Sequence, residues 1–164
     1  PTASLSPSPS ASAVSLDLTE PGQARTMVRK LIAKAGTPDL IQVEKIQAAV
    51  VLSAIGSVKN VKLKDIKSGA KLPITPARLV THDIEGPLEL LGISGNIVPA
   101  EGEGIDCHLH IMASKASGDV VGGHMFEAEV FATCEIILVE LVLDGVERHL
   151  SKEGGTPTIF FTGA

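Results

Sequence analysis

The sequence is poor in aromatic residues and in positive charge. Among its 164 residues are four Phe and neither Trp nor Tyr, so it has almost no material for the stacking platform that binds single-stranded nucleic acid. Lys and Arg total 14 against 19 Asp and Glu, a formal net charge of -5, which disfavours a general affinity for phosphate backbones. Composition therefore argues against nucleic acid as a partner.

Cysteines and long apolar runs are also scarce. The two cysteines, Cys107 and Cys134, do not make a disulfide framework and fit a reducing compartment at least as well as a secreted one. No apolar stretch approaches the roughly 20 residues needed to span a bilayer, since Glu135 and Glu140 bound the longest one. We therefore expect a soluble, cytoplasmic protein that does not enter a membrane.

What remains is enough apolar material for one core. Hydrophobic residues make up 44% of the chain, charged residues only 20%, and the mean hydropathy is +0.28. Such a surface is apolar for a monomer, so we expect an oligomer. Residues 1–13 are rich in Ser and Pro and predict a flexible tail. We expect one domain over residues 14–150 and a C-terminal extension over residues 151–164.

Hydrophobic periodicity predicts an α+β domain. Val14 to Leu18 alternates as a strand, and apolar residues recur at helical spacing from Gln23 to Ala35, before Gly36 and Pro38. The rest of the chain reads as strands separated by Gly and Pro, which indicates a strongly curved, antiparallel or mixed sheet with one or two helices. These predicted strands are Ile46 to Ala54, Val58 to Lys64, Arg78 to Asp83, Leu88 to Ile97, Ile105 to Ala113, Val120 to Met125 and Val130 to Leu143.

Three histidines are the strongest candidate site. His108 and His110 lie two residues apart in a predicted strand, so both point to one face while Leu109 and Ile111 point to the core. A lone His-x-His pair on a half-exposed strand more often binds nothing. A third histidine, His124, follows in the next predicted strand and strengthens the case for a metal.

Whether the three histidines meet depends on the pairing of these two strands. Residues 114–119 have the composition of a hairpin turn. If Ser114 pairs with Val120, His110 lies directly opposite His124, about 4.5 to 5.5 Å away between Cα atoms, whereas a shift of one residue would send His124 to the other face. Gly122 and Gly123 cost strand stability and indicate that a backbone or ligand approaches closely.

A three-histidine site would be open. Three protein ligands leave a coordination position for water or substrate, as in catalytic rather than structural zinc sites. Imidazoles suit zinc, copper, nickel and iron alike, and zinc is our preferred assignment. Asp106 lies on the histidine face, where it could orient His108 or simply be exposed.

At this point the sequence resembles a known family. Residues 90–97 (LLGISGNI), His108 to Ile111 (HLHI), Gly122 to Met125 (GGHM) and a strand with Thr133 and Glu135 are similar to the plants and prokaryotes conserved (PPC, DUF296) domain, in its stand-alone form without an AT-hook. The resemblance implies a trimer with a fold like that of α-acetolactate decarboxylase, and metal ligands at His108, His110 and His124. It also implies an association with DNA.

The chain departs from the family's DNA-binding members. It has no Arg-Gly-Arg-Pro motif. Its only local concentration of positive charge is a scattered lysine series, whose simpler interpretation is a solvated edge strand and loop; these residues are Lys59, Lys62, Lys64, Lys67 and Lys71. Glu89 stands where the family usually keeps a glutamate that follows an aromatic residue. In this chain Leu88 takes the place of the aromatic residue. Glu89 could be a fourth metal ligand or a general base for metal-bound water. It could equally be a surface carboxylate without a role in the site.

Two functions stay open at this stage. The first is a trimeric metal-binding module of binding or regulatory type, with DNA as a partner only by family analogy. The second is a zinc-dependent enzyme acting on a small oxygenated substrate, with Glu89 as base. A small-molecule ligand is compatible with both.

Overall fold

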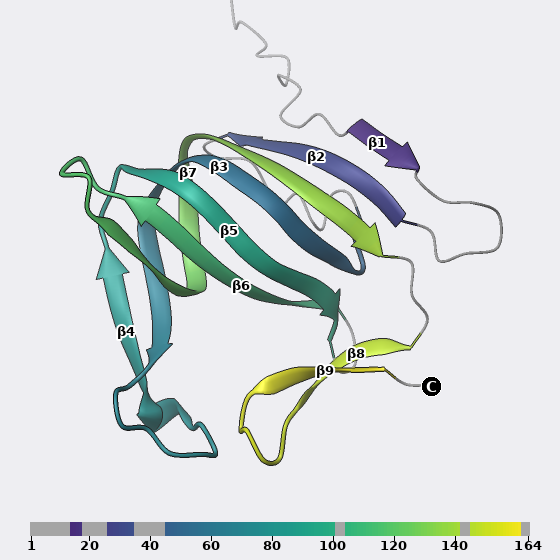
Figure 1. Cartoon of the computed structure of the whole chain (residues 1–164), viewed down its shortest axis with the longest axis vertical. Helices are drawn as coiled ribbons and strands as arrows, with labels where there is room; N and C mark the ends of the chain where they lie inside the picture. Colours follow the sequence, from purple (N-terminus) through teal and green to yellow (C-terminus); the bar gives the residue numbers. More distant parts are fainter. Residues whose placement is uncertain (1–13, 18–25, 35–44, 101–103, 142–144, 162–164) are drawn as a thin grey trace, which may run out of the picture.

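The computed structural model describes residues 14–17, 26–34, 45–100, 104–141 and 145–161. The predicted tail, residues 1–13, lies outside them. Seven strands form one sheet in the order β1-β2-β7-β6-β5-β3-β4, and a hairpin of two further strands stands beside it (Figure 1). The strands are β1 (Val14–Asp17), β2 (Thr26–Lys34), β3 (Ala49–Ile66), β4 (Leu79–Ile84), β5 (Leu88–Pro99), β6 (Ile105–Ser114), β7 (Val120–Leu141), β8 (Val146–Leu150) and β9 (Pro157–Phe161).

Four strands of the sheet close into a ring. β7 pairs with β6 through its first residues and with β3 from Met125 onward, while β5 lies between β6 and β3. Every strand-to-strand pairing is antiparallel. Register shifts along β3 and β7 mark bulges, which add bend and twist. Figure 1 shows β7 bending from the side of β6 to the side of β3.

Gly56 is required where β3 bends. Its φ is +149°, and a Cβ added there would lie 2.8 Å from the Cα of Cys134 on β7. Only a residue without a side chain allows the two backbones to approach this closely. β3 therefore runs without a break through both strands that the sequence predicts around this glycine.

The core fills the inside of the ring. Its largest fully buried side chains are those of Ile46, Ile97, Ile111 and Leu138, which have at most 2% of their surface exposed. Burying each of them stabilises the fold by roughly 1.5 to 3 kcal/mol. On β6 the buried residues Ile111 and Ala113 have odd numbers, so the even-numbered histidines project from the outer face of the ring.

One predicted element is wrong. The amphipathic helix expected over Gln23 to Ala35 is a strand in its described part, Thr26–Lys34, which pairs residue by residue with the outer edge of β7. The edge of β7 offers the nine residues of β2 a continuous ladder of backbone hydrogen bonds. Such pairing between distant parts of the chain overrides the helical spacing of apolar residues in the local sequence. Among the described residues the only helix is the short 3-10 turn Pro76–Arg78, so the expected α+β class is not confirmed, and the described domain is nearly all β.

The hairpin of β8 and β9 is not foreseen by the sequence pattern. Leu150 pairs with Pro157, and Arg148 forms a bridge to Ala100 at the end of β5. The hairpin therefore lies against the end of β5 that is next to His108 on β6 (Figure 1). The division into a domain ending at residue 150 and an extension over residues 151–164 stays a prediction. No helix in the described part of the chain is long and apolar enough to cross a membrane.

Candidate metal centre

The turn between β6 and β7 sets the register of the candidate site. The Lys115 N–H donates to the Asp119 carbonyl at 2.9 Å, and the Gly118 N–H donates to the Lys115 carbonyl at 2.8 Å. Gly118 has a φ of +88°, a left-handed conformation that glycine adopts without strain. The turn closes with Ser114 opposite Val120 and His110 opposite His124. The predicted register is therefore confirmed.

The three histidines converge on one small volume. Nε2 of His108 and Nε2 of His110 lie 3.1 Å apart, and one ring nitrogen from each of His108, His110 and His124 lies within 4.8 Å of the others. The ring centroids are 5.0 to 5.2 Å apart. His108 and His124 are half-buried, and His110 is exposed. The group is thus reachable from solvent but held by the sheet.

These spacings suit a shared metal ion. Two nitrogens bound to one tetrahedral zinc at ~2.0 to 2.1 Å are about 3.3 to 3.4 Å apart, close to the observed separation of the two Nε2 atoms. Without an ion the same contact is a hydrogen bond that requires a proton on one ring only.

The electrostatics of the site favour neutral imidazoles, which is the form that binds metal. The pKa of His108 is lowered mainly by burial and then by His124 and Arg148, while Asp106 opposes the shift. The pKa of His124 is lowered by burial and by His110, while Asp65 opposes it. Protons therefore compete weakly with a metal at neutral pH.

Asp65 on β3 supports His124 from the side. Its Oδ1 accepts the backbone N–H of His124 at 2.8 Å, and its Oδ2 lies 3.9 Å from Nε2 of His82. A Cβ at Gly123 would stand 2.6 Å from Oδ2 of Asp65, and one at Gly122 would stand 3.2 Å from the Cα of Met112. The expected close approach at both glycines is therefore confirmed. The Asp65 carboxylate lies against Gly123, and the backbone of β6 lies against Gly122.

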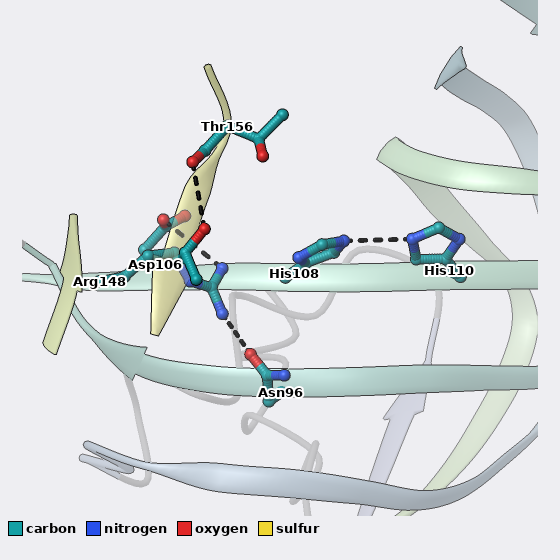
Figure 2. A network of polar contacts seen from close by, with 7 residues as sticks. Asn96, Asp106, His108, His110, Arg148 and Thr156 are labelled. Atoms are coloured by element: carbon teal, nitrogen blue, oxygen red, sulfur yellow. Dashed lines mark hydrogen bonds and ion pairs between the residues drawn. The ribbon is translucent and has the colours of Figure 1, made fainter. Parts of the chain in front are cut away.

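A buried arginine borders the other end of the site. Arg148 of β8 is 4% exposed, donates from Nη2 to Oδ1 of Asn96, and has Nη1 3.5 Å from Oδ2 of Asp106. Asn96 is the residue opposite His108 in the β5–β6 register. Figure 2 shows Arg148 between Asp106 and Asn96, with His108 and His110 following along β6. Asp106 thus pairs with Arg148 rather than standing alone at the surface.

The structure does not bring Glu89 into the cluster. Glu89 is exposed on β5 and pairs with Ser114 of β6, four residues from His110 and therefore about 13 Å along the strand. The described residues offer no fourth His, Cys, Asp or Glu to the group. Of the predicted site residues, the three histidines are together and Glu89 is apart.

The lysine series does not form a basic patch. Lys59 and Lys62 pair with Glu129 and Glu127 at 3.4 and 3.3 Å, and Lys64 lies 3.2 Å from the centre of the Phe126 ring. The lysine-bearing part of β3 is not an edge strand, since it lies between β4 and β7. The interpretation of an edge strand is therefore wrong for Lys59, Lys62 and Lys64, whose charge is largely engaged, whereas Lys67 and Lys71 do lie in the loop that follows β3.

The fold and the histidine hairpin agree with a family comparison. Residues 38–142 match the model of the Plants and Prokaryotes Conserved (PCC) domain. This is well over half of the chain, which therefore belongs to that family, as its motifs predict. No curated protein matches the sequence.

Solved structures extend the likeness over most of the chain. A metal-containing protein from Archaeoglobus fulgidus is 26% identical, with a TM-score of 0.67, over 88% of this chain and 98% of that one. A plant- and prokaryote-conserved protein from Pyrococcus horikoshii is also 26% identical, with a TM-score of 0.60, over 82% and 92%. A candidate DNA-binding protein from Ralstonia eutropha is 16% identical, with a TM-score of 0.66, over 82% and 91%, a likeness of fold alone.

Proposed function

We propose that this chain is a metal-binding domain in which His108, His110 and His124 hold one divalent ion, and that it acts as a binding or regulatory module. The observation that carries the proposal is the convergence of three ring nitrogens, with two Nε2 atoms 3.1 Å apart. The metal content of the Archaeoglobus fulgidus protein, which is similar along nearly all of its length, supports it.

The ion would keep at least one coordination position for a ligand. Three protein ligands with an exposed member, His110, correspond to an open zinc site, in which water or a small molecule takes the fourth place. Zinc fits best because a tetrahedral ion matches the nitrogen spacing and has no need of a fourth protein ligand. Copper, nickel and iron also accept imidazoles, so metal analysis decides among them.

A binding role is better supported than an enzymatic one. The enzyme hypothesis requires a base near the metal, and its candidate, Glu89, stands four strand positions away from His110. DNA rests on family analogy only, since the candidate DNA-binding relatives show the fold and the described lysines of β3 are largely engaged. A cytoplasmic location likewise stays a prediction.

The site face of the sheet favours self-association. Met112, Val120 and Phe126 are 56 to 59% exposed, and their even numbers place them on the same face of β6 and β7 as the histidines. Exposed apolar side chains gathered in this way are typical of an interface. We propose a homotrimer, as the family resemblance implies, which sedimentation velocity at several concentrations can test.

Elemental analysis of protein purified without added metal tests the central proposal. We expect about one ion per chain, as for a mononuclear site, and removal by chelator followed by stoichiometric recovery with zinc. Protein that stays metal-free after incubation with zinc, copper, nickel and iron(II) would refute the metal centre.

A further inference from the structure

Arg148 is a buried cation with incomplete compensation. A guanidinium carries five N–H donors, yet this one, 4% exposed, has two polar partners within the described residues. Its Nε is buried and has no acceptor there. Removing such a charge from water is unfavourable unless its donors are satisfied.

The two partners of Arg148 are an uneven match. Asn96 offers a neutral amide oxygen. Asp106 offers a carboxylate, but at 3.5 Å and with 40% of its side chain exposed, whereas a charge-assisted hydrogen bond is about 2.7 to 2.9 Å long. Asp106 is thus loosely held and free to turn toward solvent.

The position of Arg148 relates it to the metal centre. Asp106 precedes His108 by two residues and shares its face, and Asn96 lies opposite His108. In Figure 2 the guanidinium and the histidines lie along the same stretch of β6. A small molecule on a metal at the histidines would therefore have this cation beside it.

We propose that Arg148 is the anion-recognition group for the ligand of this centre, and that the ligand is a small carboxylate with a second, neutral oxygen donor. This inference rests on the proposed metal function. The neutral oxygen would occupy the open position on the metal, and the carboxylate would replace Asp106 at the planar guanidinium, which matches a carboxylate in two-point fashion. Asp106 holds that place while no ligand is bound.

A purely structural role for Arg148 makes a different prediction. If Arg148 only holds β8 against β5, it does so through its contacts with Asp106 and Asn96. Removing the charge of Asp106 should then destabilise the fold and should not improve ligand binding. If Asp106 competes with the ligand, the same change improves binding. The substitution Asp106→Asn therefore separates the two roles by the sign of its effect.

Calorimetric titration of the zinc-loaded full chain is the experiment. Glycolate is the probe and glycolamide, its uncharged analogue, is the control. We expect glycolate to bind roughly ten to a hundred times more tightly, as for hydrogen bonds to charged groups. Arg148→Gln should remove this preference, Arg148→Lys should keep part of it, and Asp106→Asn should strengthen glycolate binding several-fold, with bound zinc measured in every sample.

The outcomes distinguish this inference from the metal proposal. Equal binding of glycolate and glycolamide by the wild-type protein, binding of neither, or weaker glycolate binding in Asp106→Asn would overturn the role of Arg148 while zinc remains bound. Loss of zinc from the wild-type protein itself would refute the metal centre and the inference with it. The comparison of glycolate with glycolamide in the wild-type protein, together with the Asp106→Asn variant, is enough to decide the question. The inference can therefore be tested even if Arg148→Gln does not fold.

Discussion

The carboxylate of Asp65 stands beside Gly123 in the space that a Cβ would fill, with Oδ2 2.6 Å from the position of that Cβ. From this place Oδ1 accepts the N–H of His124 at 2.8 Å. The missing side chain of one residue thus admits a carboxylate that fixes the backbone of the next. His124 is the histidine that comes from the second strand of the hairpin, so its position decides whether the three imidazoles meet.

Gly123→Ala should weaken metal binding. The new methyl group would push the Asp65 carboxylate away from His124, and loss of such outer contacts typically costs 10- to 100-fold in metal affinity. Competition with a chromophoric chelator measures the change. Gly92→Ala is the matched control, because a Cβ there meets only Cε of Met112 at an ordinary 3.7 Å. Equal losses in both variants would contradict the proposed role of the space beside Gly123.

Asp65→Asn should lower zinc affinity by roughly tenfold. The amide oxygen can still accept the His124 N–H, so the change removes mainly the negative charge that raises the pKa of His124 and with it part of the ligand's basicity. The same chelator competition applies. Asp83→Asn, at an exposed position of β4, should leave the affinity unchanged. A normal affinity in Asp65→Asn would show that the charge has no part in the site.

Single histidine replacements should identify the ligands. His110→Ala should lower zinc affinity at least about a hundredfold, more than the loss of an outer contact, and should not unfold the chain because His110 is exposed. His149→Ala is the control, because His149 lies on the β8–β9 hairpin outside the three-histidine cluster. The centroid of its ring is 5.6 Å from that of Phe160. Zinc content after dialysis and circular dichroism measure the two effects. Retention of zinc by His110→Ala would remove this residue from the ligand set.

The metal-free protein should lose stability as the pH falls below 6.5. The pKa values of His108 and His124 are lower in the folded chain than their ordinary value of 6.5, so below that value the unfolded chain binds more protons. Stability should therefore be constant above this value and decline beneath it. Urea unfolding at about pH 5.5 and about pH 7.5 measures the difference. His108→Asn combined with His124→Asn should flatten the profile, and an unchanged slope would show that other groups cause it.

Duplex DNA should bind weakly. With a net charge of -5 and with Lys59, Lys62 and Lys64 engaged by neighbouring side chains, few phosphate contacts are available. Fluorescence anisotropy with an AT-rich duplex at physiological salt should show no binding below about 100 μM. Tighter binding that weakens steeply with salt would restore DNA as a partner.

The sequence predicts the local part of the site well. The period of two along 108–110 and the turn over residues 114–119 are short-range features, and together they determine that His110 faces His124. β5 and β6 are predicted nearly to their ends, whereas β7 runs without a break through two strands that the sequence predicts separately. Local pattern failed for Thr26–Lys34, where pairing with the distant β7 decides the structure.

The supporting residues could not be found in the same way. Asp65 is 59 residues from His124 and Arg148 is 52 from Asn96, so their contacts arise only when the ring closes and the hairpin docks. One signal for Arg148 does exist in the sequence. It shares the alternation of Val146 and Leu150, which places a charged residue on an apolar face, and buried arginines of this kind have a partner or a ligand.

The proposed site draws on two separate parts of the chain. The histidines belong to the sheet within residues 38–142, the part that matches the family model, whereas Arg148 lies on β8, beyond that match. Metal chemistry and choice of ligand would then evolve independently. A relative with a different C-terminal hairpin could then bind a different ligand at the same three-histidine site. Exchanging this hairpin between family members would be a direct way to change which ligand the proposed centre recognises.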